Sequence, residues 1–185
     1  MWTRSMKGAA MVATVALATF GVVRMSEAGT NDAQLVSEAQ QTIAVYKKAD
    51  PGIEAFFRRS VGYVVFPGIG KGGLGIGGAH GTGVLFEGGA PVGKVTMNQV
   101  TIGAQAGGQE FSQVIFYEVP HALQELKGGK ASFSAGVSAV ALNSGAAESA
   151  RFKNGIAVFT ATKGGLMLEA SVGGQKFSYE PLTAP

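Results

Sequence analysis

The sequence contains no cysteine, and this absence excludes several kinds of site. Structural disulfides, zinc centres built on thiolates, cysteine nucleophiles and a lipid attached through an N-terminal cysteine all need that side chain. The stability of the fold therefore has to come from packing. With 46% hydrophobic residues in a chain of 185, there is enough apolar material for one domain with a sizeable core.

Charged residues and histidines are also scarce. Charged residues make up 15% of the chain and the formal net charge is only +3, whereas a nucleic-acid-binding protein normally carries a strong basic footprint. We therefore expect no nucleic-acid partner. His80 and His121 are the only histidines, and neither has the i, i+4 partner of a zinc-protease helix. We expect no metal site and no cofactor.

Catalytic motifs are missing as well. The sequence has no G-x-S-x-G elbow, and spacing ties neither histidine to a serine and an acid. Residues 88–94 fit the G-x-x-x-x-G-K pattern of a phosphate-binding loop, but Val95 stands where a serine or threonine should hold magnesium. We therefore predict that the protein is not an enzyme.

Glycine, in contrast, is abundant and concentrates in residues 61–83, VGYVVFPGIGKGGLGIGGAHGTG. Two registers of this run, starting at Gly70 and Gly73, fit the dinucleotide fingerprint G-x-G-x-x-G. That fingerprint also needs a helix to open at its third glycine. Glycine at this density disfavours a helix, and residues 84–86 resume a strand. We predict glycine-rich strand and turn rather than a nucleotide site.

The first 28 residues have the layout of a secretory signal peptide. Arg4 and Lys7 precede the apolar run GAAMVATVALATFGVV, and small residues occupy the two positions that determine cleavage after Ala28. The run is short for a membrane span, which needs about 20 residues, although Arg24 leaves an uncleaved anchor as the lesser option. Cleavage would leave a formal charge of +1. We expect an exported, periplasmic protein, soluble or peripherally attached to a membrane, with residues 29–185 forming a single domain.

Hydrophobic spacing predicts helices at the start of this domain. Residues 32–48 have apolar groups at helical intervals. Asp50-Pro51 then signals the start of a second, short helix, which ends at Arg58-Arg59. One brief internal helix is expected at 120–127, beginning with proline and stopped by Gly128.

The rest of the domain is typical of strands separated by glycine. The connections are too short for parallel crossovers, so we expect antiparallel neighbours. Glycine inside strands permits sharp bends, and the predicted fold class is α+β, with a strongly bent, barrel-like antiparallel sheet packed against N-terminal helices. The expected strands are 63–66, 83–86, 94–105, 111–119, 132–142, 156–162, 166–172 and 176–179.

Basic residues supply the only candidate binding groups. For any one of them, a solvated surface charge is the simpler interpretation. Four of them flank the N-terminal helices, where Phe56 and Phe57 are available beside them, and basic groups next to exposed aromatics suit an anionic lipid surface. The candidate head-group contacts are Lys47, Lys48, Arg58, Arg59, Lys71 and Lys94.

Five segments in order resemble the SYLF domain family: YVVFPGIGKGG, GGAHGTGVLF, VTIGAQAGGQEFSQVIFY, LKGGKASFSAGVSAVAL and IAVFTATKGGLMLEASVGGQKFSY. The resemblance covers about residues 35–180, and the ordered set is more specific than any one glycine cluster. That domain is related to the actin-binding region of a yeast endocytic adaptor. Eukaryotic relatives bind phosphoinositides and other anionic phospholipids, some bind actin, and exported bacterial members are generally labelled lipid-binding by homology. The resemblance implies that FPGIGKGG is a structural glycine loop between strands, with Lys71 presented towards a phosphate head group.

The chain departs from the eukaryotic pattern at Lys94-Val95-Thr96, where those relatives carry a tryptophan-serine pair. It has no SH3 or FYVE module, and an exported bacterial protein meets neither actin nor phosphoinositides. The resemblance and the basic residues together predict non-enzymatic binding of anionic phospholipid at a bacterial envelope membrane. Two alternatives stay open: an envelope scaffold or protein-interaction module and, with less support from the strand lengths, an integral outer-membrane β-barrel.

Overall fold

The computed structural model describes residues 19–133, 139–162 and 174–182, and the side chains of these ranges except 19–30, 73–76 and 101–108. The described elements confirm the predicted α+β class. In chain order they are α1 (Thr19–Ala49), η1 (Pro51–Ile53), α2 (Glu54–Arg59), β1 (Gly62–Glu87), β2 (Ala90–Tyr117), α3 (Pro120–Lys127), β3 (Val140–Ala141), α4 (Ala146–Ser149), β4 (Ile156–Thr162) and β5 (Gln175–Pro181).

The three predicted helices are present. Helix α1 contains the segment predicted as helical but begins at Thr19, so it runs through the expected cleavage position after Ala28. The cap and proline before the second helix act as expected, because Oδ1 of Asp50 accepts a hydrogen bond from the backbone N–H of Gly52 at 3.0 Å. Among the described helices, none is both long and apolar enough to span a membrane.

The four strands predicted between residues 63 and 119 are parts of only two long strands, β1 and β2, of 26 and 28 residues. They pair antiparallel along their whole length, from Gly62 opposite Tyr117 to the last pair beside the turn. The turn consists of Gly88 and Gly89, whose φ angles of +58° and +84° suit the mirror-image hairpin turn that matches strand twist. The two strands therefore form one continuous ribbon.

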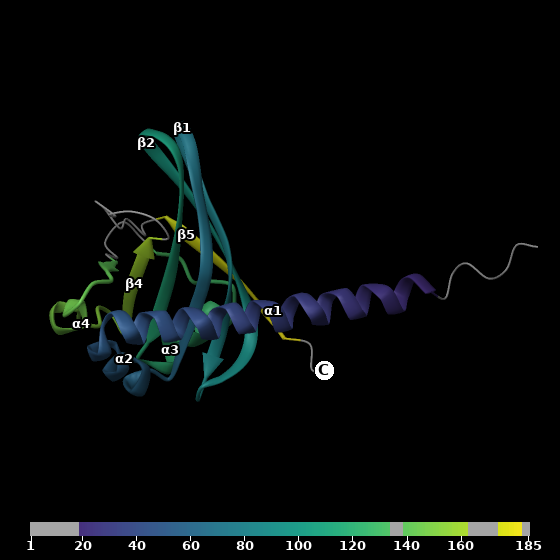
Figure 1. Cartoon of the computed structure of the whole chain (residues 1–185), viewed down its shortest axis with the longest axis horizontal. Coiled ribbons are helices and arrows are strands. Elements are labelled where there is room, and N and C mark those ends of the chain that lie inside the picture. The colour runs from purple at the N-terminus through teal and green to yellow at the C-terminus, as the bar shows by residue number, and fades with distance from the viewer. Residues whose placement is uncertain (1–18, 134–138, 163–173, 183–185) are drawn as a thin grey trace, which may run out of the picture.

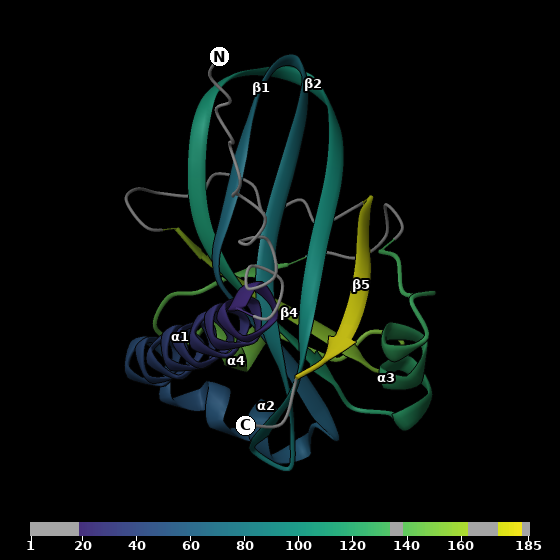
Figure 2. The ribbon, with the colours of Figure 1, turned by 90° about the vertical axis from the view of Figure 1, so that its right-hand side faces the viewer.

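The segment FPGIGKGG lies inside β1, so its prediction as a loop between strands is wrong. The ribbon of β1 and β2 folds over in its middle, as Figures 1 and 2 show, and the two halves of β1 come into contact. A Cβ atom on Gly83 would lie 2.5 Å from the carbonyl oxygen of Val65, and one on Gly81 would lie 2.9 Å from that of Gly68. Glycine is needed at these positions because the backbone of the second half of β1 lies too close to the backbone of its first half for a side chain to fit.

Strand β2 also pairs with two later strands. Its C-terminal half pairs antiparallel with β4 and its N-terminal half with β5, which confirms the antiparallel pairing predicted for these strands. Strand β3 pairs in parallel with β4, so the expectation of antiparallel neighbours fails at this pair. A strand is predicted at 132–142. In the described part of this range, only β3 is a strand, and Ser132 forms an isolated β-bridge. The strand predicted at 166–172 lies outside the described residues.

Alternate residues of the sheet face two separate clusters of buried side chains. Ile115 belongs to one cluster together with Leu126 of α3. Val114 belongs to the other, together with Tyr46 of α1 and Phe56 of α2. Phe56 is only 6% exposed, so it fixes α2 to the sheet instead of lying on the surface beside the basic residues. This packing fixes where the last turns of α1 and α2 point.

Candidate functional site

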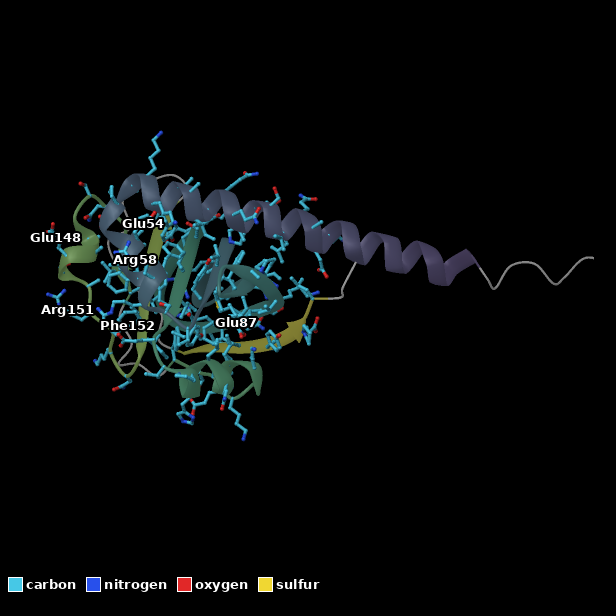
Figure 3. All side chains as sticks on the ribbon, turned by 90° about the horizontal axis from the view of Figure 1, so that it is seen from below. Glu54, Arg58, Glu87, Glu148, Arg151 and Phe152 are labelled. Atoms are coloured by element: carbon cyan, nitrogen blue, oxygen red, sulfur yellow. The ribbon has the colours of Figure 1, made fainter. Side chains whose placement is uncertain are left out.

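Four of the six predicted head-group contacts come together at one end of the molecule. Lys47 and Lys48 lie in the last turn of α1, and Arg58 and Arg59 lie in the last turn of α2. Glu54 of α2 links the two helices, because one of its carboxylate oxygens lies 3.1 Å from Nζ of Lys47 in α1. Its other carboxylate oxygen lies 3.9 Å from Nη1 of Arg58 within α2. Figure 3 shows Glu54 and Arg58 at this end.

Acidic partners compensate much of this positive charge. Besides the two cations that share Glu54, Arg59 forms an ion pair with Glu118 just beyond β2. Lys48 is exposed and makes no ion pair in the part of the chain that the structure describes. Lys47 lies over the half-buried ring of Phe57, with Nζ 5.0 Å from the ring centroid. The four cations are therefore close together but only partly free to meet a ligand.

The other two predicted contacts lie elsewhere. Lys71 is in the bent middle of β1, opposite Gln109, and the bend and α2 lie at opposite ends of the molecule in Figures 1 and 2. Lys94 on β2 lies 3.8 Å from Asp32 of α1 and 3.4 Å from Glu180 of β5. It ties three elements together, so the six cations do not form one surface.

Arg151 and Phe152 join the site, and sequence reasoning did not identify them. The guanidinium carbon of Arg59 lies 5.1 Å from the centroid of the Phe152 ring, and that ring lies 5.1 Å from the ring of Phe56. Nη1 of Arg151 donates to the carbonyl oxygens of Glu148 at 2.6 Å and of Ala150 at 2.7 Å. Helix α4 has four residues, too few for a periodic pattern, and the only signal was the basic and aromatic run Arg-Phe-Lys at 151–153.

A buried carboxylate holds α4 against the N-terminal helices. Asp50 is 4% exposed, and while its Oδ1 caps η1, its Oδ2 accepts a hydrogen bond from the backbone N–H of Ala147 at 2.7 Å. The position of Arg151 after α4 therefore depends on the same residue that starts the second helix. We call the surface formed by Lys47, Lys48, Arg58, Arg59 and Arg151 the basic end.

A cavity of about 390 Å³ opens between α2 and α4 at the basic end. Its walls carry charged groups of both signs and two aromatic rings, with small residues between them. Figure 3 labels three of the side chains involved, Glu148, Arg151 and Phe152. The functional groups of the cavity are Arg59, Glu118, Glu148, Arg151, Phe56 and Phe152.

A second cavity, of about 410 Å³, lies between α1 and the sheet. Val45 of α1, which is 60% exposed, forms part of its wall, and Ser112 of β2 lies against it. Close by, the hydroxyl of Tyr46 donates to the carbonyl oxygen of Ser112 at 2.9 Å. Burial raises the pKa of the Tyr46 phenol well above its usual range, so the hydroxyl stays protonated and donates this hydrogen bond.

Each of the two histidines has one polar side-chain partner recorded among the described residues. Nδ1 of His80 lies 2.8 Å from Oδ1 of Asn98 across the β1–β2 ribbon, and Nε2 of His121 lies 3.4 Å from Glu125 within α3. The described residues contain no group of three or more metal-ligating side chains. The arrangement is suited to binding charged groups at a surface.

Comparison with known proteins adds nothing to this geometry. No protein-family model matches the chain, and no curated protein matches it. The resemblance to the SYLF family therefore stays a prediction from the sequence motifs.

Proposed function

We propose that the protein binds anionic phospholipid at a bacterial envelope membrane through the basic end. The observation that carries this proposal is the grouping on one surface of cations from α1, α2 and the segment that follows α4. The basic end brings five cations together, against the nearby carboxylates of Glu54, Glu118 and Glu148. The excess is two positive charges, and a cation near an anionic membrane contributes about 1 kcal/mol.

The ion pairs of the basic end do not prevent such a contact. The side chains of Arg58 and Glu54 are 71% and 45% exposed, and exposed ion pairs typically contribute only about 0–1 kcal/mol. At the exposed pair of Arg58 and Glu54, a lipid phosphate can therefore replace the carboxylate partner at little cost. The same pairs lower the net gain, so we expect weak, salt-sensitive binding.

Flotation with vesicles tests this function. The protein should float with phosphatidylglycerol vesicles at low salt, and much less with phosphatidylcholine vesicles or at high salt. A variant with Lys47, Lys48, Arg58 and Arg59 all changed to glutamine should lose about 2–4 kcal/mol of binding free energy, because four cations are removed and the excess of two positive charges becomes an excess of two negative charges. Lys130→Gln, which removes one exposed cation after α3, is the control for a charge change outside the basic end and should bind as the wild type.

Equal recovery with anionic and neutral vesicles would contradict the proposal. So would unchanged binding by the quadruple variant while its circular dichroism shows a native fold. A protein partner captured by cross-linking and retained after lipid extraction would favour the scaffold alternative instead.

A further inference from the structure

The cavity between α2 and α4 differs from the rest of the basic end because its charges balance. Arg59 and Arg151 supply two positive charges, and Glu118 and Glu148 supply two negative ones. Arg59 already pairs with Glu118 and stacks on Phe152. A cavity of about 390 Å³ is within the size range of small-molecule sites.

A simple anion does not suit this arrangement. It would take Arg59 away from Glu118 and would leave that carboxylate facing a second negative charge, which is unfavourable at close range. A ligand that brings its own cation avoids this, since the carboxylate exchanges one positive partner for another. The charge pattern therefore selects a zwitterion.

We propose that this cavity binds a phosphoethanolamine group, a phosphate joined through two methylenes to a primary ammonium. Arg151 receives the phosphate. Its Nη1 is held by two carbonyl oxygens, and a guanidinium carries five N–H donors in a rigid fork, so donors remain for the ligand. Arg59 is the second phosphate contact, oriented by the ring of Phe152.

Glu148 receives the ammonium. Glu118 is the second carboxylate near the ammonium, because Arg59 leaves Glu118 to contact the phosphate. The carboxylate of Glu148 makes no ion pair among the described residues, so it is available without breaking a contact. The two methylenes of the ligand lie against Phe152 and the alanines of the wall. Each charged group of the ligand thus meets an opposite charge, and its short apolar part meets apolar surface.

A phosphate joined through two methylenes to an ammonium occurs both in soluble phosphoethanolamine, which is a phosphate monoester, and in the head group of phosphatidylethanolamine, which is a phosphate diester. Binding of the free group does not require a membrane. The lipid form rests on the proposed function, because the cavity opens on the basic end. The two sources are therefore tested separately.

Calorimetric titration of the purified full chain with free phosphoethanolamine tests the cavity itself. Phosphoethanolamine should bind at least about tenfold more tightly than inorganic phosphate or ethanolamine, a difference of about 1.4 kcal/mol. Glu148→Gln should remove this preference and leave the affinity for inorganic phosphate unchanged or higher. Arg151→Gln should weaken both ligands, and Lys130→Gln, outside the cavity, should weaken neither.

Two results would overturn the proposal: phosphate binding as tightly as phosphoethanolamine, which indicates an anion site, or no binding of either. Because Arg151 also contacts the end of α4, Arg151→Gln risks loosening that helix. Glu148→Gln does not carry this risk, so an unchanged preference in that variant contradicts the proposal by itself.

Vesicles separate this inference from the proposed function. Phosphatidylglycerol vesicles without ethanolamine lipid test the basic end alone, and mixed vesicles with phosphatidylethanolamine or phosphatidylcholine test the cavity. If the protein binds both vesicle mixtures equally and does not bind free phosphoethanolamine, the phosphoethanolamine site is contradicted and the membrane-binding function is retained. If the protein binds free phosphoethanolamine but no vesicles, the membrane-binding function is contradicted and the phosphoethanolamine site is retained.

Discussion

Two buried tyrosines show how much a single hydroxyl contributes to this fold. Tyr46 and Tyr117 are both 0% exposed. The Tyr46 hydroxyl donates to the Ser112 carbonyl oxygen, whereas the Tyr117 hydroxyl has no hydrogen-bond partner among the described residues. We expect Tyr46→Phe to lower the free energy of unfolding by about 1 kcal/mol, and Tyr117→Phe to leave it unchanged or raise it. Urea denaturation measures both, and equal losses would contradict this assignment.

The same phenols predict how stability changes at alkaline pH. Burial raises the pKa of Tyr46, Tyr63 and Tyr117 above the ordinary value, while unfolded tyrosines ionise near pH 10. The unfolded chain therefore loses these protons first, so their contribution to stability is complete below about pH 10 and falls as the pH rises further. Urea midpoints between pH 8 and 11 should show this decline, and Tyr117→Phe should make it shallower. Tyrosinate absorbance from the buried phenols before unfolding would contradict it.

At the scale of elements, the bend in β1 depends on glycine at particular positions. A Cβ atom on Gly83 would meet the carbonyl oxygen of Val65 at 2.5 Å, whereas nothing lies within 4 Å of the place that a Cβ atom on Gly70 would take. We expect Gly83→Ala to destabilise the protein by about 1–3 kcal/mol or more through overpacking, while Gly70→Ala changes stability little. Thermal unfolding of both variants is the measurement. Similar melting temperatures would show that the two halves of β1 do not touch.

The contact between η1 and α4 depends on one carboxylate. Replacing Asp50 by alanine removes both of its acceptors, at Gly52 and at Ala147, and should cost about 1–3 kcal/mol because two backbone donors lose their partner. Asp50→Asn keeps one acceptor and should cost less. Hydrogen exchange at the Ala147 amide should accelerate in the alanine variant. If that amide stays protected, α4 is held by its alanines alone.

The helices and the sheet class can be predicted from the sequence because those signals are local. Helical spacing and the cap at Asp50 act within a few residues. The glycine-rich part of β1 is instead predicted as strand and turn, since glycine usually interrupts strands. Only the folded chain shows that Gly81 and Gly83 permit one half of β1 to pass against the other, and this contact is not local.

The site was predictable to a similar extent. The cations at the ends of α1 and α2 were found because helix ends can be read from the sequence. The approach of Arg151 to Arg59 was not predictable, because it depends on the contact of Asp50 with α4 across about a hundred residues. Nor could the sequence show that Lys71 and Lys94 lie apart from the other four.

At the scale of the whole molecule, the basic end and the bend of the β1–β2 ribbon lie at opposite ends (Figures 1 and 2). A flat membrane cannot contact both at once. We therefore expect Lys71→Gln to leave binding to phosphatidylglycerol vesicles unchanged, while the quadruple variant of the basic end weakens it. Flotation of the two variants in parallel makes the comparison. Loss of binding in Lys71→Gln alone would move the membrane contact to the glycine-rich bend.

The turn at Gly88 and Gly89 also has a consequence for how fast and in which order the chain folds. Pairing of β1 with β2 can start at this turn and spread outwards, each new pair closing only a slightly longer loop. Strand β5, in contrast, joins residues 93–99 from a position about eighty residues later in the chain, a contact with a much higher entropic cost. We therefore expect the β1–β2 ribbon to form first and β5 to pair with it late.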